Sequence, residues 1–171
     1  MLELLEKFER EVIPDLIRQP EIWKLKHFAF DKPGFRIQRL YTPVGENTVR
    51  LHRFEPYGPR SAAMIHHHIW PMAARLLEGE YEMQVGYTEG NAEPPCLMRL
   101  MMRAPMAYEM TDVNIWHSVR PLTQTYTVLV HGPEFPINRG DPNEGGVTYL
   151  NRSDERRDEL LAEFHRFYPK S

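Results

Sequence analysis

The spacing of hydrophobic residues differs between the two ends of the chain and its middle. Across residues 2–17, apolar side chains recur every three or four positions, with acids and bases between them. This spacing places them on one face of an amphipathic α-helix. Residues 154–168 repeat the pattern, with Ser153 as a predicted N-cap. Both ends are therefore expected to be helices that pack on the rest of the protein. The apolar positions are Leu2, Leu5, Phe8, Val12, Ile13 and Leu16, and then Leu160, Leu161, Phe164 and Phe167.

The middle of the chain has the pattern of short β-strands. Strand-like segments are separated by glycine, proline, asparagine or aspartate. Eight or so strands with helices only at the ends indicate an antiparallel sandwich or barrel. Within LLEGEYEMQVGY, two strands are joined by a tight hairpin in which Gly79 takes the unusual backbone angle. The predicted strand segments are 36–43, 47–56, 63–70, 73–87, 96–104, 107–110, 114–122 and 125–135.

Length and charge narrow the class of protein. A chain of 171 residues is expected to form one domain with a real core. The formal net charge is −3 and no run is rich in Lys or Arg, so nucleic acid is not an expected partner. The single cysteine, Cys96, excludes an internal disulfide and is expected to pack as a small hydrophobe. The charged N-terminal segment suits neither a signal peptide nor a membrane span, and we expect a cytoplasmic protein without a membrane partner.

Three consecutive histidines, His66, His67 and His68, interrupt one strand-like segment. On a strand, His66 and His68 share a face and His67 points to the other. Two imidazoles on one face form a clamp for a metal ion, whose third ligand must come from elsewhere. His117, in NIWHSVRPL, suits a neighbouring strand. The spacing leaves alternatives open: His52, His131 or His165 as the third ligand, or histidines that only donate hydrogen bonds or lie at the surface.

These residues resemble the motifs of the cupin superfamily. Its first motif has a His-x-His pair, a glutamate and a hairpin glycine, and its second supplies a later histidine. Here they match His66 and His68, Gly79 and His117, and the resemblance covers residues 35–136. It implies an all-β fold, a cupin-type antiparallel β-barrel (double-stranded β-helix) with flanking N- and C-terminal α-helices. A single cupin domain over residues 1–171 would then comprise an N-terminal helical segment 1–30, the barrel core 35–136, and a loop and C-terminal helix 137–171.

The chain departs from the cupin pattern at two positions. The motif glutamate falls seven residues before the hairpin glycine, where this chain has Met72. Methionine is a poor ligand for a hard divalent ion, so the site would have three histidines and no carboxylate. Asn114 stands where the second motif has glycine, three residues before the histidine. Asparagine tolerates the left-handed conformation, so we expect the turn to survive.

A three-histidine cupin without the glutamate resembles the cysteine dioxygenase branch, which oxidises thiols with ferrous iron and molecular oxygen. That branch has a tyrosine on the strand after the third histidine, and His131 falls nearest its place. Two residues earlier, where that branch has a histidine, this chain has Leu129. No cysteine stands at position 72 or 73, so the Cys–Tyr crosslink of that branch cannot form. These differences leave the substrate open.

The resemblance also indicates residues that bind substrate. Arg36 and Arg39 roughly match the place of a carboxylate-binding arginine, a role that suits the bidentate guanidinium. Because they are three residues apart on a strand, Arg36 and Arg39 face opposite ways, so at most one of them can point inward. The alternative is that both are exposed to solvent. Trp70 and Met72 are typical core residues, yet ligand sites are mostly apolar, and both are candidates to line the pocket.

His131 is the candidate acid–base group of this branch. An unperturbed imidazole titrates near pH 6.5, so proton transfer near neutral pH is expected of it. The alternative is that His131 hydrogen-bonds the backbone at the barrel rim.

Three functions follow from these residues. The first is a mononuclear non-haem Fe(II) dioxygenase acting with molecular oxygen on a small thiol or carboxylate-bearing substrate. The second is a cupin isomerase, lyase or hydrolase in which the metal is only a Lewis acid. The third is a non-catalytic module that binds a small ligand. Iron is favoured because an oxygenase needs redox change, although the ligands would also accept Zn, Ni, Cu or Mn. The sequence does not decide whether the protein forms a homodimer.

Overall fold

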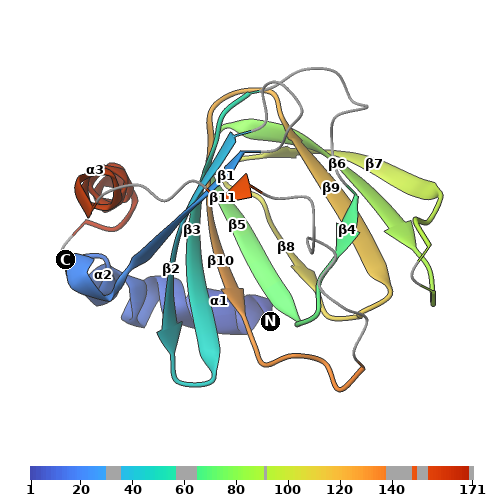
Figure 1. Cartoon of the computed structure of the whole chain (residues 1–171), viewed down its shortest axis with the longest axis horizontal. Helices are drawn as coiled ribbons and strands as arrows, with labels where there is room; N and C mark the ends of the chain where they lie inside the picture. Colours follow the sequence, from blue (N-terminus) through green and yellow to red (C-terminus); the bar gives the residue numbers. More distant parts are fainter. Residues whose placement is uncertain (30–35, 57–64, 91, 138–147, 150–153, 170–171) are drawn as a thin grey trace.

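The structure, a computed structural model, describes residues 1–29, 36–56, 65–90, 92–137, 148–149 and 154–169. Helical elements lie at the two ends of the chain and strands fill the middle (Figure 1). The helical elements are α1 (Leu2–Glu11), α2 (Ile13–Leu16), η1 (Pro20–Ile22), α3 (Asp154–Phe164) and η3 (His165–Phe167). The strands are β1 (Lys24–Ala29), β2 (Arg36–Val44), β3 (Asn47–Phe54), β4 (His66–His67), β5 (Met72–Glu78), β6 (Glu80–Tyr87), β7 (Cys96–Arg103), β8 (Ala107–Met110), β9 (Ile115–Pro121), β10 (Thr125–His131) and β11 (Thr148–Tyr149).

The strands form two sheets that pack face to face. One sheet has seven strands in the order β11-β1-β2-β3-β10-β5-β8, and the other has four in the order β4-β9-β6-β7. Every strand pairing in the described residues is antiparallel. Side chains of β5 pack between the sheets against side chains of β6 and β7, as in the cluster of Leu76, Tyr81, Met83 and Met102. The predicted antiparallel β-fold with flanking helices is confirmed.

Helices cover the outer face of the seven-stranded sheet (Figure 1). Leu5 and Phe8 of α1 and Leu160 and Phe164 of α3 belong to one buried cluster with alternate residues of β2, β3 and β10. These strand residues include Leu40, Leu51 and Val128. Since side chains alternate along a strand, the residues between them face the other sheet. This alternation decides which residues reach the interior where the histidines lie.

The two ends of the chain are less regular than the sequence pattern suggests. The predicted helix over residues 2–17 breaks at Val12, whose φ is −119°, and resumes as α2. Pro14 lies in the first turn of α2, where its missing N–H removes no hydrogen bond that the helix needs. At the other end, α3 stops at Phe164 and a 3₁₀ turn follows. Ser153, the predicted N-cap, lies outside the described residues.

The expectation of a helical segment over residues 1–30 is wrong for its last part. Residues 24–29 form β1, which pairs with β2 along six residues and with β11. Cys96 is also not packed as expected, because it is exposed at the start of β7. At residues 24–29 and at Cys96, strand pairing within the sheets determines the structure and the exposure, and the local sequence pattern does not.

The predicted hairpin between β5 and β6 is confirmed at Gly79. Its φ is +86°, in the region that favours glycine. A Cβ built there would collide with the backbone oxygen of Gln124 and lie 2.7 Å from Oγ1 of Thr125. The turn at Asn114 is present, as expected, but not through a left-handed conformation, because no non-glycine residue in the described ranges has a positive φ. Its backbone N–H instead donates to Oδ1 of Asp112 at 2.8 Å, and this bond holds the turn before β9.

Among the described residues, none of the helices has the length and apolar character needed to cross a membrane.

Candidate metal centre

Two short antiparallel stretches bring the histidines together. His66 of β4 is the register partner of His117 of β9, and His67 is the partner of Trp116. Alternation places His67 on the other side of the strand from His66, with its ring 4.7 Å from that of Trp116. His117 faces the interior, because Val119, two residues on, packs into the cluster between the sheets. His66, His68 and His117 therefore converge, while His67 lies on the opposite face.

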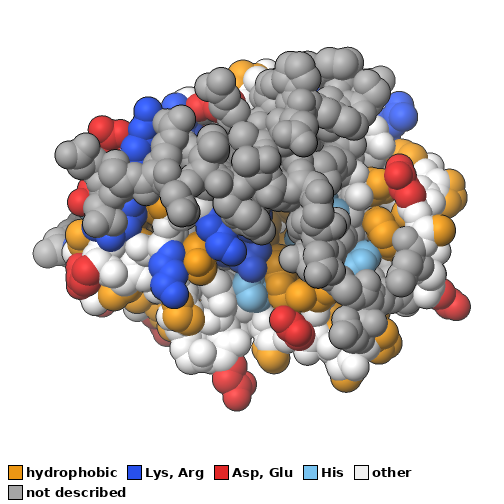
Figure 2. Space-filling model, in the orientation of Figure 1, with side chains coloured by type: hydrophobic (Ala, Val, Ile, Leu, Met, Phe, Trp, Pro, Cys, Tyr) orange, Lys and Arg blue, Asp and Glu red, His pale blue; other side chains and the backbone are white. Residues whose placement is uncertain are grey.

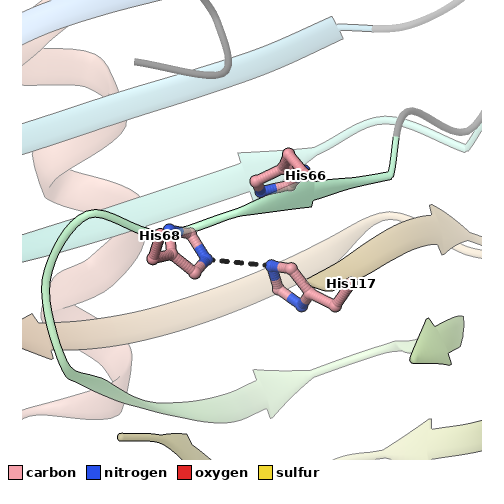
Figure 3. Close-up of side chains that lie close together, drawn as sticks. All are labelled: His66, His68 and His117. Atoms are coloured by element: carbon pink, nitrogen blue, oxygen red, sulfur yellow. Dashed lines mark hydrogen bonds between the residues drawn. The ribbon is translucent and has the colours of Figure 1, made fainter. Parts of the chain in front are cut away.

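The nitrogen atoms of the three imidazoles are close enough to share an ion. One ligand nitrogen from each of His66, His68 and His117 lies within 4.8 Å of the others. Nε2 of His68 and Nε2 of His117 are 3.0 Å apart and point toward one another (Figure 3). Two nitrogens at right angles around an ion, each about 2.1 Å from it, would be separated by about 3.0 Å. The spacing of His68 and His117 fits neighbouring ligands of one metal ion.

Burial keeps the imidazoles in the form that binds metal. Burial lowers the pKa of His117 well below its usual value, and His66 adds to this effect. The pKa of His68 is lowered well below its usual value by burial, and then by His117, His66 and the guanidinium groups of Arg50 and Arg39. Only a neutral imidazole offers a lone pair to a metal.

The second ring nitrogen of His117 has no partner among the described residues. Nδ1 of His117 is buried and lacks a hydrogen bond there. Metal-binding histidines usually donate this N–H to a neighbouring group, and such a bond fixes the orientation of the ring. His117 is oriented instead by strand pairing with His66 and by the nearby ring of Tyr108, whose centroid lies 6.1 Å away.

No carboxylate joins the three histidines in the part of the chain that the structure describes. Met72 is fully buried among Trp70, Met110 and Leu129 on the inward face of β5. Glu78 lies 2.8 Å from the guanidinium of Arg166. Glu82 lies on the outer face of β6, with a carboxylate oxygen 3.8 Å from Nε of Arg120. The geometry is that of a three-histidine set.

Arg39 points into the interior. It is the register partner of His52, and its Nε donates to Nε2 of His52 at 2.7 Å. Since Nε2 accepts, the neutral His52 carries its proton on Nδ1, which lies 3.2 Å from Oγ1 of Thr127. Burial lowers the pKa of His52 well below its usual value, and Arg39 and Arg50 lower it further. The side chain of Arg36 lies outside what the structure describes.

Trp70 connects the histidines to a second arginine. Its ring stacks on His68, with centroids 4.4 Å apart and planes inclined by 26°. It also stacks on His131, with centroids 4.1 Å apart and planes inclined by 20°. The guanidinium carbon of Arg50 lies 4.4 Å from the Trp70 ring, within cation–π distance.

His131 occupies the face of β10 that the sequence predicts, together with Leu129, while Val128 and Val130 face the helices. Its Nδ1 donates to the carbonyl of Gly132 at 2.9 Å, which is the backbone bond expected under the alternative interpretation. Nε2 is buried without a hydrogen-bond partner among the described residues. Burial lowers the pKa of His131 to about 4, so the expected titration near pH 6.5 is wrong. At neutral pH the ring is neutral, with a lone pair on Nε2.

The sequence interpretation missed Arg50 and misjudged His52. The segment VRLHRF places Arg50 and His52 two residues apart, and this spacing would have put both on one face of a strand. His52 was a rival third ligand, but it is engaged with Arg39. His165, another alternative third ligand, lies in the helical region, where its Nε2 is 2.9 Å from the carbonyl oxygen of Ile17.

Comparison with known proteins supports the fold and little more. No protein-family model matches the chain. No curated protein matches it either. Among solved structures, the chain is similar to Fe(II)-HppE with the alternative substrate (S)-1-HPP, at 12% identity and a TM-score of 0.50 over 66% of this chain and 57% of that one. It thus spans 57% of the length of HppE.

Two shorter proteins are similar over most of their own length. KdgF from Halomonas sp. has 14% identity and a TM-score of 0.45, over 63% of this chain and 88% of that one. An RmlC-like cupin from Shewanella frigidimarina NCIMB 400 has 13% identity and a TM-score of 0.45, over 64% of this chain and 86% of that one. From its two antiparallel sheets and the similarity to HppE, the chain has a cupin-type β-fold with flanking helices.

Proposed function

We propose that this chain is a metal-dependent enzyme in which His66, His68 and His117 bind one metal ion between the sheets. The observation that carries the proposal is the convergence of three imidazole nitrogens, with those of His68 and His117 3.0 Å apart. Three neutral ligands leave an ion with its full positive charge and with coordination positions available to other molecules. A purely structural zinc site is usually closed by four protein ligands.

The finer proposal is a mononuclear non-haem Fe(II) dioxygenase that oxidises a small thiol or carboxylate-bearing substrate. The absence of a carboxylate from the described ligand group supports it, because that is the feature that resembles the thiol dioxygenases. The chemistry that ferrous iron supplies when bound is the activation of dioxygen beside a coordinated substrate. HppE, an Fe(II) protein by its description, supports a redox metal in a fold of this kind.

The side chains around the histidines would position the substrate. Arg39, held by His52, offers a guanidinium to a carboxylate. Trp70 and Met72 supply apolar surface that excludes water beside His68. His131, neutral and with its Nδ1 proton committed to Gly132, would accept a hydrogen bond or a proton at Nε2. A neutral His131 would therefore act as a proton acceptor, whereas a protonated imidazolium would act as a proton donor.

One experiment tests the proposal at both levels. Protein purified without a His-tag is analysed for bound metal, and oxygen consumption is then measured across a panel of small thiols and small carboxylates. We expect about one equivalent of iron and substrate-dependent oxygen uptake. Stoichiometric metal without oxygen uptake would reject the dioxygenase and favour a Lewis-acid enzyme. Protein that binds no divalent metal under any loading condition would overturn the metal-dependent function.

A further inference from the structure

We propose that the protein forms a symmetric homodimer in which β7 of one copy pairs antiparallel with β7 of a second copy, with Leu100 at the twofold axis. This pairing joins the two four-stranded sheets into one continuous sheet. The inference does not rest on the metal-dependent function, because β7 carries none of the proposed metal ligands.

Strand β7 is the longest strand at a sheet edge in the described parts of the chain. The smaller sheet ends in β4 and β7, and the larger sheet ends in β11 and β8. β7 has 8 residues, whereas β8 has 4 and β4 and β11 have 2 each. On its outer side, β7 has no neighbouring strand among the described residues. A long unpaired edge favours pairing with another chain, and proteins usually keep such edges short or protected.

The side chains of β7 make this edge apolar. Leu97 is 66% exposed, Met98 is 52% exposed and Met101 is 44% exposed. Hydrophobic side chains gather at the edge of the molecule where β7 lies (Figure 1, Figure 2). The strand contains neither Pro nor Lys, the residues that commonly protect a sheet edge. An exposed apolar edge of this kind is typical of an interaction surface.

The backbone groups of Arg99 and Met101 point away from β6. Ala104, at the hairpin end of the β6–β7 pairing, donates its N–H to the carbonyl of Gly79. In an antiparallel pair, every second residue bonds the same neighbouring strand. Counting back from Ala104 along the register, the even-numbered residues bond β6. Arg99 and Met101 therefore direct their N–H and C=O groups outward, where the described residues place no strand.

The backbone at the two ends of β7 is less available. Met106 engages Arg103 twice: its N–H donates to the Arg103 carbonyl at 2.8 Å, and its Sδ accepts from the Arg103 N–H at 3.5 Å. At the other end, Leu97 has no partner on β6, because the register shifts there. The regular and available part of the edge is therefore centred on Leu100.

This edge is complementary to a second copy of itself. When Leu100 faces Leu100 of the second copy, Arg99 lies opposite Met101, and these two residues exchange N–H···O=C hydrogen bonds across the interface. The twofold axis repeats the exchange, so the outward groups of both residues are satisfied in both copies. A register centred on Arg99 would place two guanidinium groups directly opposite, and one centred on Met101 would place Arg99 opposite Arg103. Like charges directly opposite one another are destabilising.

The side chains suit the same register. The aliphatic stem of Arg99 can cover Met101 of the second copy while its guanidinium stays in water. On the inward face, Met98 lies opposite Met102 of the second copy, a residue of the cluster between the sheets. The two Arg99 side chains are diagonal neighbours, and salt screens their repulsion at this exposed position. A single strand pair buries less surface than a standard interface, so we expect a dissociation constant of about 1–100 μM.

Sedimentation velocity of the unmodified 20.2 kDa chain tests the association. From about 1 μM to about 300 μM, we expect the mean mass to rise from that of the monomer toward twice that value. Protein with the monomer mass at every concentration would overturn the proposal and leave β7 to a strand of a different protein.

Met101→Pro separates dimerisation from folding. It removes an outward N–H that β6 does not use, and proline is tolerated at such positions of an edge strand. Each copy loses one hydrogen bond to the other, so the dissociation constant should rise at least about tenfold while circular dichroism stays unchanged. If this variant fails to fold, Met101→Lys places a second cation opposite Arg99 and should also weaken the dimer.

The matched control is Ile137→Lys. Ile137 is 55% exposed and follows β10, outside the strands, so this variant should associate like the unmodified protein. Folded Met101 variants that associate as tightly as the control would overturn the proposal.

The single cysteine reports the register of the two strands. Cys96 is exposed at the start of β7 and accepts a spin label. At about 3.4 Å per residue, its two Cα atoms lie about 27 Å apart in the dimer centred on Leu100 and about 20 Å apart in one centred on Arg99. Double electron–electron resonance of the labelled dimer measures this separation. A value near the longer distance is expected, and one near the shorter distance would reject the pairing centred on Leu100.

Discussion

The indole of Trp70 stacks on the imidazole of His68, with ring centroids 4.4 Å apart and planes 26° from parallel. The same indole stacks on His131 and carries the guanidinium of Arg50. Trp70 thus limits rotation of His68 about its side-chain bonds, a role that hydrogen bonds from neighbouring groups play in many metal sites. The arrangement makes Trp70 a positioning residue for a proposed metal ligand.

Replacing Trp70 should therefore weaken metal binding without removing a ligand. For Trp70→Leu we expect a loss of about 10- to 100-fold in metal affinity, the scale of lost orienting partners. Trp70→Phe keeps an aromatic face and should lose less. Competition with a chromophoric chelator measures both affinities. Equal affinity in the leucine variant and the unmodified protein would show that stacking has no part in orienting His68.

The alternation of side chains along residues 66–68 predicts opposite results for the adjacent His67 and His68. His68→Ala removes a nitrogen that lies 3.0 Å from His117, and metal content should fall sharply. His67→Ala removes a ring that packs against Trp116 on the other face, and metal content should stay near that of the unmodified protein. Metal analysis of both variants after identical loading checks the difference. The reverse result would mean that β4 is shifted by one residue.

Met72→Glu introduces a carboxylate at the position that corresponds to the glutamate of the first cupin motif. Met72 is fully buried beside Trp70, so the variant should tighten metal binding and suppress oxygen uptake by occupying an open position. Without metal, a carboxylate in this apolar cluster should lower the melting temperature, because a buried charge lacks a partner. Met72→Gln is the neutral control and should leave metal affinity nearly unchanged. If Met72→Glu bound metal no more tightly than Met72→Gln, Met72 would not lie beside the ion.

The pKa of His131 predicts a contribution to acid sensitivity. Burial holds this pKa at about 4 in the folded protein, against about 6.5 in an unfolded chain. Between these values the unfolded state binds the extra proton, so stability falls as the pH is lowered from about 6.5 to about 4. The contribution is at most about 3 kcal/mol. Metal-free His131→Phe should show a correspondingly smaller loss of stability over this range, measured by denaturant unfolding at several pH values.

The same variant tests the catalytic part of His131. With metal retained, His131→Phe should lower turnover by roughly 10²- to 10⁴-fold if the lone pair on Nε2 accepts a proton in the reaction. Unchanged turnover with an altered pH dependence of stability would leave His131 as a structural group bonded to Gly132.

Local pattern was sufficient for much of the fold. Periods of two and of three to four residues located the strands and the terminal helices, because side-chain direction repeats with the backbone of each element. The opposite orientation of His66 and His67, the turn at Gly79 and the inward face of His131 all follow from these local rules. The break at Val12 and the strand β1 were missed, since a proline in a first turn and a short strand that is defined by its pairing with β2 and β11 carry weak local signals.

Only the tertiary structure decided which distant residues share the site. Spacing alone left His52, His117, His131 and His165 as rival third ligands, because it does not say which strands become neighbours, and only the cupin resemblance favoured His117. Pairing of β4 with β9 brings His117 to His68, whereas pairing of β2 with β3 engages His52 with Arg39. The low pKa of His131 and the stack from Arg50 through Trp70 to His68 likewise arise from burial and packing between sheets, which are properties of the folded chain.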